Sequence, residues 1–250
     1  MIKAITFDLW DTVIHDDSDE RKRIAAGKPS KHEARRLLAA EAFFDSARID
    51  RRDVLAAYDT MEAAFSHVWH EQHVTWTVAE RIAVLEKGLG HKLAPETARR
   101  LVNALEEMEI AIAPDPVPGV ADALGNLSGR FKLGVVSDAI YSPGRCLRQW
   151  LEMHGLKQYF HGFAFSDEVG RSKPHRIMFA SVADQLGVRI EEMLHIGDRD
   201  HNDVKGPQAF GMKAILFTAT RDLDKETTSA NAVCGCYADL PGIIDRIAAR

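Results

Sequence analysis

The chain has 250 residues, of which 46% are hydrophobic and 28% are charged, values typical of a soluble globular protein of one large domain or two moderate ones. Its net charge of −5, without a long basic stripe, argues against a nucleic-acid partner. No apolar run approaches a membrane span and the amino terminus has no signal-type segment, so we expect no membrane partner. Three cysteines without zinc-type spacing fit a reducing compartment, and we expect a cytoplasmic protein.

The chain opens on a strand and then turns helical. Residues 2–7 are apolar, include β-branched side chains and end at a polar turn, which predicts a short buried strand. From about 20 to 112 the periodicity is helical. Apolar side chains recur every three or four residues over 54–69, and Thr77 with Glu80 forms a capping box ahead of another helix. This block therefore predicts a bundle of helices.

A proline-rich breaker at 114–119 ends the helical block, and strands then alternate with helices. The expected strands are 131–136, 162–165, 193–196 and 213–217, and the expected helices are 119–128, 143–154, 174–186 and 202–210. This alternation predicts a Rossmann-like α/β fold, a parallel sheet with helices on both faces. The first strand must join this sheet, because it has no other partner. We therefore expect an α/β core of residues 1–15 and 117–250, with an all-helical domain, 16–116, inserted into it.

Two stretches of the inserted block carry unusual side chains. The mixed-charge run 21–36 is interpreted as a solvated helix face rather than a binding patch. His67, His70 and His73 are spaced as neighbours on one helix, among aromatic residues. We interpret them as partly exposed histidines. A zinc site and a place at the substrate entrance are the alternatives, although no Glu or Cys ligand set accompanies them.

Polar side chains stand at the ends of several predicted segments. Asp8 follows the first strand, Ser137 closes the second, and Lys173 precedes a predicted helix. Asp198 and Asp203 lie in a glycine-containing loop after the fourth strand. Ligands of open parallel α/β sheets bind at the carboxyl ends of the strands, so we expect these groups to converge on one reaction site.

The chemistry of these groups is complementary. The Asp8 carboxylate can act as a nucleophile that forms a covalent intermediate. Asp198 together with Asp8 offers the hard oxygen ligands that Mg²⁺ prefers, and Asp203 binds through water or orients the loop. Lys173 can offset the repulsion between carboxylates and hold a phosphoryl oxygen, and Ser137 with nearby backbone N–H groups can donate to the same oxygens. Helix capping is the structural alternative for Asp203.

In order and spacing these motifs resemble the haloacid dehalogenase-like hydrolases, a superfamily made up mostly of magnesium-dependent phosphatases. The motifs are residues 7–12, Ser137, Lys173-Pro174 and 196–203, and the resemblance spans residue 2 to about 239. It implies that the inserted helices form a cap, that Asp8 is the nucleophile, and that Mg²⁺ is the cofactor.

The resemblance also implies further site residues. The backbone carbonyl of Trp10 becomes a metal ligand beside Asp8, Asp198 and Asp203. Thr12 and Asp138 join Ser137 and Lys173 in binding the substrate, and the Thr12 hydroxyl is expected to support the turn. Asp200, in the same loop as Asp198, is expected to face solvent.

One position departs from the family pattern. Most phosphatases of this family carry a second Asp two residues after the nucleophile, which protonates the leaving alcohol and then activates water. Here that residue is Trp10, and an indole cannot transfer protons at any accessible pH. General acid–base help is worth roughly 10²–10⁴-fold, so three outcomes are open. The substrate has a leaving group that needs no proton, as in an acyl or aryl phosphate, or the acid comes from the cap or the substrate, or the protein is slow or inactive. Asp11, one residue later, is a weak substitute.

The sequence therefore favours a magnesium-dependent phosphatase of a small phosphorylated metabolite, acting as a monomer or homodimer. An aromatic residue at position 10 also resembles the metal-independent 2-haloacid dehalogenases, and Phe179 stands near the place of their tyrosine. The acidic loop at 196–203 argues against that alternative. A weakly active or non-catalytic phosphate- or metal-binding module is the third hypothesis. Phosphonatase chemistry needs a cap lysine that forms a Schiff base, and none is apparent.

Overall fold

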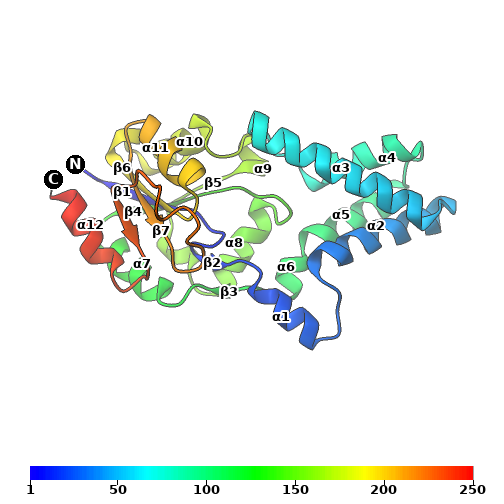
Figure 1. Cartoon of the computed structure of the whole chain (residues 1–250), viewed down its shortest axis with the longest axis horizontal. Coiled ribbons are helices and arrows are strands. Elements are labelled where there is room, and N and C mark those ends of the chain that lie inside the picture. Colours follow the sequence, from blue (N-terminus) through cyan, green and yellow to red (C-terminus); the bar gives the residue numbers. More distant parts are fainter. Residues whose placement is uncertain (250) are drawn as a thin grey trace.

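The computed structural model describes residues 1–249 and contains a six-stranded, fully parallel sheet (Figure 1). The strand order is β5-β4-β1-β6-β7-β8. The strands are β1 (Ala4–Phe7), β4 (Lys132–Ser137), β5 (Gly162–Phe165), β6 (Met193–Gly197), β7 (Lys213–Phe217) and β8 (Ala232–Cys234). The first strand lies at the centre, with Ile5 opposite Leu133 on one side and Leu194 on the other. The Rossmann-like fold and the five expected strands are confirmed, and β8 is the one strand of this sheet that was not expected.

Helices cover both faces of the sheet because its strands are apolar on both sides. α7 (Val120–Ser128), α8 (Gly144–Met153) and α12 (Leu240–Ala248) pack on the face that includes Ile5 and Phe7. α10 (Arg176–Leu186) packs on the opposite face, beside Ala4 and Val136, and α11 (Gly206–Ala209) contacts β7. The shorter helices are α9 (Ser166–Val169), two 3₁₀ turns at Lys157–Tyr159 and Ile190–Glu192, and a π-helical turn at Asp200–Lys205.

Two expected helices differ in detail. The helix expected from residue 174 begins at Arg176, where the side chain of His175 accepts a hydrogen bond from the backbone N–H of Ile177. The helix expected over 202–210 is the π-helical turn followed by α11. The motif around Asp203 therefore lies in irregular helical backbone.

The inserted block is all-helical and has its own hydrophobic core, at the opposite end of the molecule from the carboxyl-terminal α12 (Figure 1). Buried Phe43, Tyr58 and Ile82 lie at its centre, and the Thr77–Glu80 capping box is present. None of the helices in residues 1–249 combines the length and the apolar character that a bilayer span requires. The helices are α1 (Ser18–Ala25), α2 (Lys31–Ala47), α3 (Arg51–Gln72), α4 (Val78–Leu89), α5 (Pro95–Glu106) and α6 (Met108–Ala111).

A small antiparallel ladder joins the two ends of the inserted block. β2 (Ile14–His15) pairs with β3 (Asp115–Pro116), with Ile14 opposite Pro116. The chain thus leaves and re-enters the sheet domain at one place, a feature that periodicity could not reveal in strands of two residues. We propose 16–116 as the limits of the cap domain on this basis.

Candidate active site

Three polar side chains converge where neighbouring strands end. Asp8 directly follows β1, Ser137 is the last residue of β4, and Asp198 directly follows β6. The chain runs outward from β1 through β4 to β5 and then returns to the other side of β1 at β6. Ligands of open α/β sheets bind in the crevice at such a reversal of strand order, so the topology alone marks this edge as a site.

Asp8 is held by two hydrogen bonds and one ion pair. Its backbone N–H donates to the carbonyl of Ile196 at 2.9 Å, which continues the pairing of β1 with β6. Its Oδ1 accepts a hydrogen bond from Ser137 Oγ at 2.9 Å and lies 2.7 Å from Lys173 Nζ. Burial raises the pKa of Asp8, and the ammonium of Lys173 opposes this effect. The carboxylate is therefore fixed in position.

Lys173 is a buried cation among carboxylates. Only 3% of the residue is exposed, and its Nζ also donates to Asp203 Oδ1 at 2.6 Å. Burial lowers the pKa of Lys173, but the charges of Asp203, Asp8 and Asp138 outweigh it and hold the pKa above its usual value. The side chain is thus a permanent ammonium in a site whose other charges are mostly negative.

Asp203 is completely buried, and its two oxygens are already occupied. Oδ1 contacts Lys173 and lies 3.2 Å from His195 Nε2, while Oδ2 accepts from the backbone N–H of Arg199 at 3.0 Å. His195 is fixed in turn by Thr6, whose hydroxyl lies 2.8 Å from Nδ1. Asp203 therefore holds both Lys173 and the loop after β6.

Asp198 has the opposite character. Its Oδ2 is buried without any hydrogen-bond partner, and the nearest cations are Arg221 Nε at 3.7 Å and Arg199 Nε at 3.9 Å. Burial, reinforced by the nearby charges of Asp203 and Asp8, raises the pKa of Asp198 to about 8. A buried carboxylate oxygen without a donor is costly, which indicates that this one is completed by a cation.

The donor set fits a divalent metal ion. One oxygen each from Asp8, Asp198 and Asp203 lies within 4.8 Å of the others, and no second such cluster occurs in residues 1–249. Magnesium prefers carboxylate oxygens and retains several waters. The buried ammonium of Lys173 contacts Asp8 and Asp203, and the partly exposed guanidinium groups of Arg221 and Arg199 stay 3.7 and 3.9 Å from Asp198, so a divalent ion would balance the remaining negative charge.

Asp138 links the cap to the sheet domain. Its Oδ1 accepts from the backbone N–H of Lys173 at 2.9 Å, and its backbone carbonyl accepts from Trp10 Nε1 at 3.1 Å. From the cap, Trp69 Nε1 donates to Asp138 Oδ2 at 3.4 Å. Burial raises the pKa of Asp138 to about 6 despite the charge of Lys173. Two indoles, one from each domain, are thus oriented by one residue.

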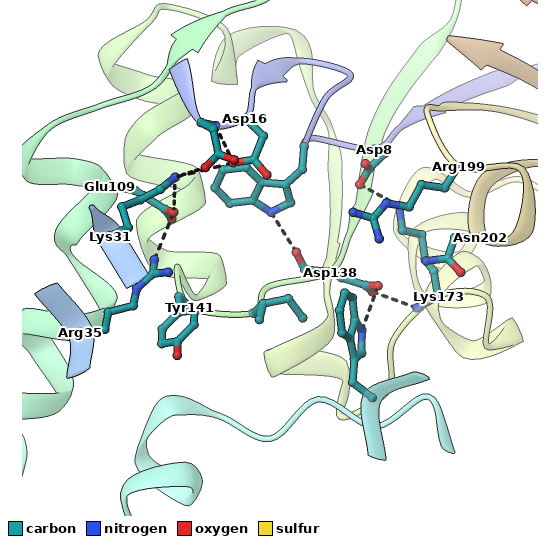
Figure 2. Close-up of a pocket in the computed structure, with 14 residues that line it drawn as sticks. Asp8, Asp16, Lys31, Arg35, Glu109, Asp138, Tyr141, Lys173, Arg199 and Asn202 are labelled. Carbon is teal, nitrogen blue, oxygen red and sulfur yellow. Dashed lines mark hydrogen bonds and ion pairs between the residues drawn. The ribbon is translucent and has the colours of Figure 1, made fainter. Parts of the chain in front are cut away.

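A cavity of about 240 Å³ extends from the carboxylate site to the start of the cap. Asp8 and Lys173 lie at one end, and Lys31, Arg35 and Glu109 lie at the other (Figure 2). Its volume suits a small molecule. The other residues that line the cavity are Trp10, Asp16, Asp17, Trp69, Asp138, Ile140, Tyr141, Arg199 and Asn202.

The far end of the cavity is a buried charge network that the sequence did not reveal. Lys31 Nζ lies 3.0 Å from Asp19, 3.2 Å from Asp17 and 3.2 Å from Glu109, and Arg35 also contacts Glu109 at 3.2 Å. Burial lowers the pKa of Lys31, but Glu109 and the other carboxylates outweigh it and raise the pKa above its usual value. The interpretation of 21–36 as a solvated face is therefore wrong for Arg23, Lys31 and Arg35, which are buried against their hydrogen-bond and ion-pair partners.

Thr12, Asp200 and Asp11 differ from what the sequence suggests. The Thr12 hydroxyl supports nothing, because it is buried without a partner, and the Thr12 carbonyl instead accepts from Tyr237 Oη. Asp200 does not face solvent: it is 5% exposed and accepts from the Thr228 hydroxyl. Asp11 does not line the cavity, so it supplies no acid there.

The histidine stretch does not form a metal site. His67 and His70 are exposed, and the cluster of metal-ligand type found in residues 1–249 contains no histidine. His73 ends α3, and its backbone carbonyl accepts from the N–H of Ser172 at 2.9 Å, next to Lys173. The stretch thus lies at the contact between cap and sheet domain.

Comparison with known proteins identifies the family. The sequence profile described as haloacid dehalogenase-like hydrolase matches residues 2–211. A glyceraldehyde 3-phosphate phosphatase of Methanopyrus kandleri is 26% identical over 246 residues, which cover 96% of this chain and 94% of the relative. A phosphoglycolate phosphatase of Salmonella typhi is 30% identical over 158 residues, which cover 59% of this chain and 61% of the relative.

Solved structures share the fold over nearly the whole chain. A phosphatase of this superfamily from Thermococcus onnurineus has a TM-score of 0.62 at 20% identity and covers 97% of this chain and 98% of its own. A 2-haloacid dehalogenase from Pseudomonas syringae has a TM-score of 0.65 at 20% identity and covers 99% and 100%. The fold alone thus does not separate the two chemistries, but the profile match settles the family: the chain belongs to the haloacid dehalogenase-like hydrolases.

Proposed function

We propose that the protein is a magnesium-dependent phosphatase of a small phosphorylated metabolite. The observation that carries this proposal is the unpartnered, buried Asp198 oxygen beside Asp8 and Asp203. Three buried carboxylates at close range destabilise one another, and the ammonium of Lys173 with the more distant guanidinium groups of Arg199 and Arg221 offsets this only in part, so the cluster favours a metal-dependent enzyme. The two phosphatase relatives support the same substrate class.

The geometry suggests a role for each group. An Asp8 oxygen attacks phosphorus and the bond to the leaving oxygen breaks, which gives an aspartyl phosphate that water later hydrolyses to inorganic phosphate. Ser137 and Lys173 hold phosphoryl oxygens, since both already contact Asp8 at 2.9 and 2.7 Å. Asp138 accepts a hydrogen bond from the backbone N–H of Lys173 and so positions that residue. Thr12, expected to bind the substrate, is fully buried and does not line the cavity, so we assign it no contact with the substrate.

The metal ligands divide into two kinds. Asp8 and Asp198 have oxygen atoms available to the ion. The backbone carbonyl of Trp10 is the further ligand that the family resemblance implies. Asp203 is better suited to positioning, because Lys173 and the loop backbone already occupy its oxygens. When bound, Mg²⁺ supplies positive charge to the phosphoryl oxygens as negative charge develops.

Dehalogenase activity is the second candidate, because Trp10 places an aromatic ring where an acid is expected and one structural relative is a 2-haloacid dehalogenase. A halide leaves without a proton, so the lack of an acid at this position costs nothing there. The carboxylate cluster is the argument against it. The third candidate is a phosphate- or metal-binding module that turns over slowly because Trp10 replaces the acid.

One panel tests these candidates. Phosphate release from acetyl phosphate and 4-nitrophenyl phosphate is measured with Mg²⁺ and with excess EDTA, and halide release from 2-chloropropionate is measured in parallel. We expect chelator-sensitive phosphate release that Asp8→Asn abolishes. Asp11→Asn is the matched control, because Asp11 does not line the cavity, and it should retain activity. Chelator-resistant halide release would support the dehalogenase, and phosphate binding without turnover would support the binding module.

A further inference from the structure

We propose that the substrate is an aryl phosphate whose ring lies against the Trp10 indole. This inference rests on the proposed phosphatase function and specifies its leaving group. Trp10 lines the cavity that contains Asp8 and Lys173, so it borders the space that a leaving group must occupy. Trp10 thus occupies the position of the usual acid and forms an aromatic part of the cavity wall.

The leaving group follows from proton chemistry. An alkoxide is a poor leaving group unless an acid protonates it, and Trp10 cannot do so. A phenoxide is far less basic because the ring delocalises its charge, so the P–O bond can break with both electrons on the phenolic oxygen, which solvent protonates later. Acyl phosphates satisfy the same requirement, so the leaving-group argument alone leaves two substrate classes.

The wall of the cavity distinguishes them. One part of the Trp10 ring packs against the core cluster of the sheet, and its N–H is fixed on the Asp138 carbonyl. No other aromatic ring or guanidinium of residues 1–249 stacks on Trp10. The indole is therefore held in one orientation without a stacking partner of its own, as a platform for a planar ligand would be.

The other rings of the cavity are already engaged. Tyr141 lies between two guanidinium groups, those of Arg35 at 3.6 Å and Arg81 at 4.0 Å from its centroid. Trp69 lies parallel to Phe65 with centroids 6.4 Å apart, and its N–H reaches Asp138. Among the aromatic rings that line the cavity, Trp10 is thus the one without a stacking partner in the described part of the chain. Beyond it the cavity ends at the charged groups of Lys31 and Glu109, which limits the ligand to a small ring (Figure 2).

The test separates ring binding from catalysis. Phenylphosphonate and cyclohexylphosphonate carry the same charged group on a flat and a puckered ring of similar size, and neither is hydrolysed. Their binding to the magnesium-loaded protein is measured by calorimetry for wild type, Trp10→Leu and Trp10→Phe. We expect wild type to bind phenylphosphonate about 3- to 10-fold more tightly than its cyclohexyl analogue, the value of an aromatic pair. Trp10→Leu should lose this preference and Trp10→Phe should keep most of it.

Each outcome either supports or overturns the inference that a ring stacks on Trp10. Equal binding of the two phosphonates by wild type, or an undiminished preference in Trp10→Leu, overturns the inference. If Trp10→Leu does not fold, the wild-type ratio and the Trp10→Phe ratio still decide it. Failure of the proposed function would give a different result, because acetyl phosphate has no ring. If the wild-type protein hydrolyses neither acetyl phosphate nor phenyl phosphate, the proposed phosphatase function is contradicted, whatever the ratio of the two phosphonate affinities.

Discussion

The ammonium of Lys173 lies 2.7 Å from the Asp8 carboxylate, and the two side chains are only 2% and 7% exposed. Both charges have lost most of their water, so each depends on the other and on Asp203. Such a pair contributes less to stability than its distance suggests, because desolvation offsets the attraction. Its value here is to fix the direction of the Asp8 oxygen.

Replacing Lys173 with methionine should reduce kcat on acetyl phosphate by about 10²–10³-fold, the range for loss of one donor to developing charge. It should also lower the free energy of unfolding by about 3–5 kcal/mol, because buried Asp8 and Asp203 lose their cation. Urea denaturation and steady-state kinetics measure the two effects. Lys157→Met is the matched control: Lys157 is 37% exposed and pairs with Glu152 at the surface, so both values should stay close to wild type.

Magnesium affinity should depend on pH through Asp198. Its pKa in the metal-free protein is raised to about 8, so below pH 8 a proton occupies the carboxylate that the ion needs. Binding must release that proton, and the apparent affinity should fall by up to about tenfold per pH unit below pH 8. Calorimetric titration with Mg²⁺ at pH 6, 7, 8 and 9 measures the slope. Asp198→Asn should bind weakly with a flatter slope, and an unchanged slope in that variant contradicts the assignment.

The same shift affects the stability of the metal-free protein. A carboxyl group whose pKa is raised on folding stabilises the native state while it is protonated, and this contribution is lost as the pH rises from the ordinary value near 4 to about 8. The melting temperature of the metal-free protein should therefore carry a contribution that decreases over this range. Mg²⁺ should raise the melting temperature more at pH 8 than at pH 6, and differential scanning fluorimetry measures both. An increase independent of pH argues against a protonated Asp198.

The position of the site could be predicted from the sequence because it depends on local patterns. Asp8, Ser137 and Asp198 each follow an apolar run, and parallel strands place such residues at one edge of the sheet. Lys173 does not follow a strand, and its place before a predicted helix together with the family resemblance pointed to it. Hydrophobic periodicity likewise predicted the inserted helices, because each buries one apolar face in a shared core.

The far end of the cavity could not be predicted in this way. Lys31 and Arg35 look like a solvated charge run because the partner that buries them, Glu109, lies at the other end of the inserted block. The ladder that joins the two ends has only two residues in each strand, too few for a period to show. The lack of a hydrogen-bond partner for the buried Thr12 hydroxyl could not be predicted either, because it depends on neighbours that are distant in the sequence.

Arg81 should control the attachment of the cap. It is 1% exposed, its Nη1 donates to Glu62 at 3.1 Å, its Nη2 donates to the Ile140 carbonyl, and it stacks on Tyr141. Arg81→Met should lower the free energy of unfolding by about 3–5 kcal/mol because it leaves these acceptors without their donor. It should also raise KM, since Ile140 and Tyr141 line the cavity.

Urea denaturation and kinetics on acetyl phosphate check this prediction. Arg100→Met is the control, because Arg100 is exposed and its contact with Thr97 is long, at 3.5 Å. Arg81→Lys should be intermediate, since it keeps the charge and loses the planar group that donates and stacks at once. Wild-type stability in Arg81→Met would show that the cap is held by apolar packing alone.

Replacing Trp10 with aspartate should change which phosphates are hydrolysed. The new carboxyl group would stand two residues after Asp8, where it can protonate an alkoxide, and turnover of glycerol phosphate should rise by up to about 10²–10⁴-fold. Trp10→Asn removes the ring equally but cannot transfer a proton at neutral pH, so it should leave glycerol phosphate turnover low. Kinetics of both variants on glycerol phosphate and acetyl phosphate measure the effect, after circular dichroism has established that each is folded. Acetyl phosphate needs no acid, so its kcat should hardly respond to the carboxyl group, and the ratio of the two substrates isolates proton transfer from any loss of packing. Equal glycerol phosphate turnover in the aspartate and asparagine variants would mean that another group already supplies the proton.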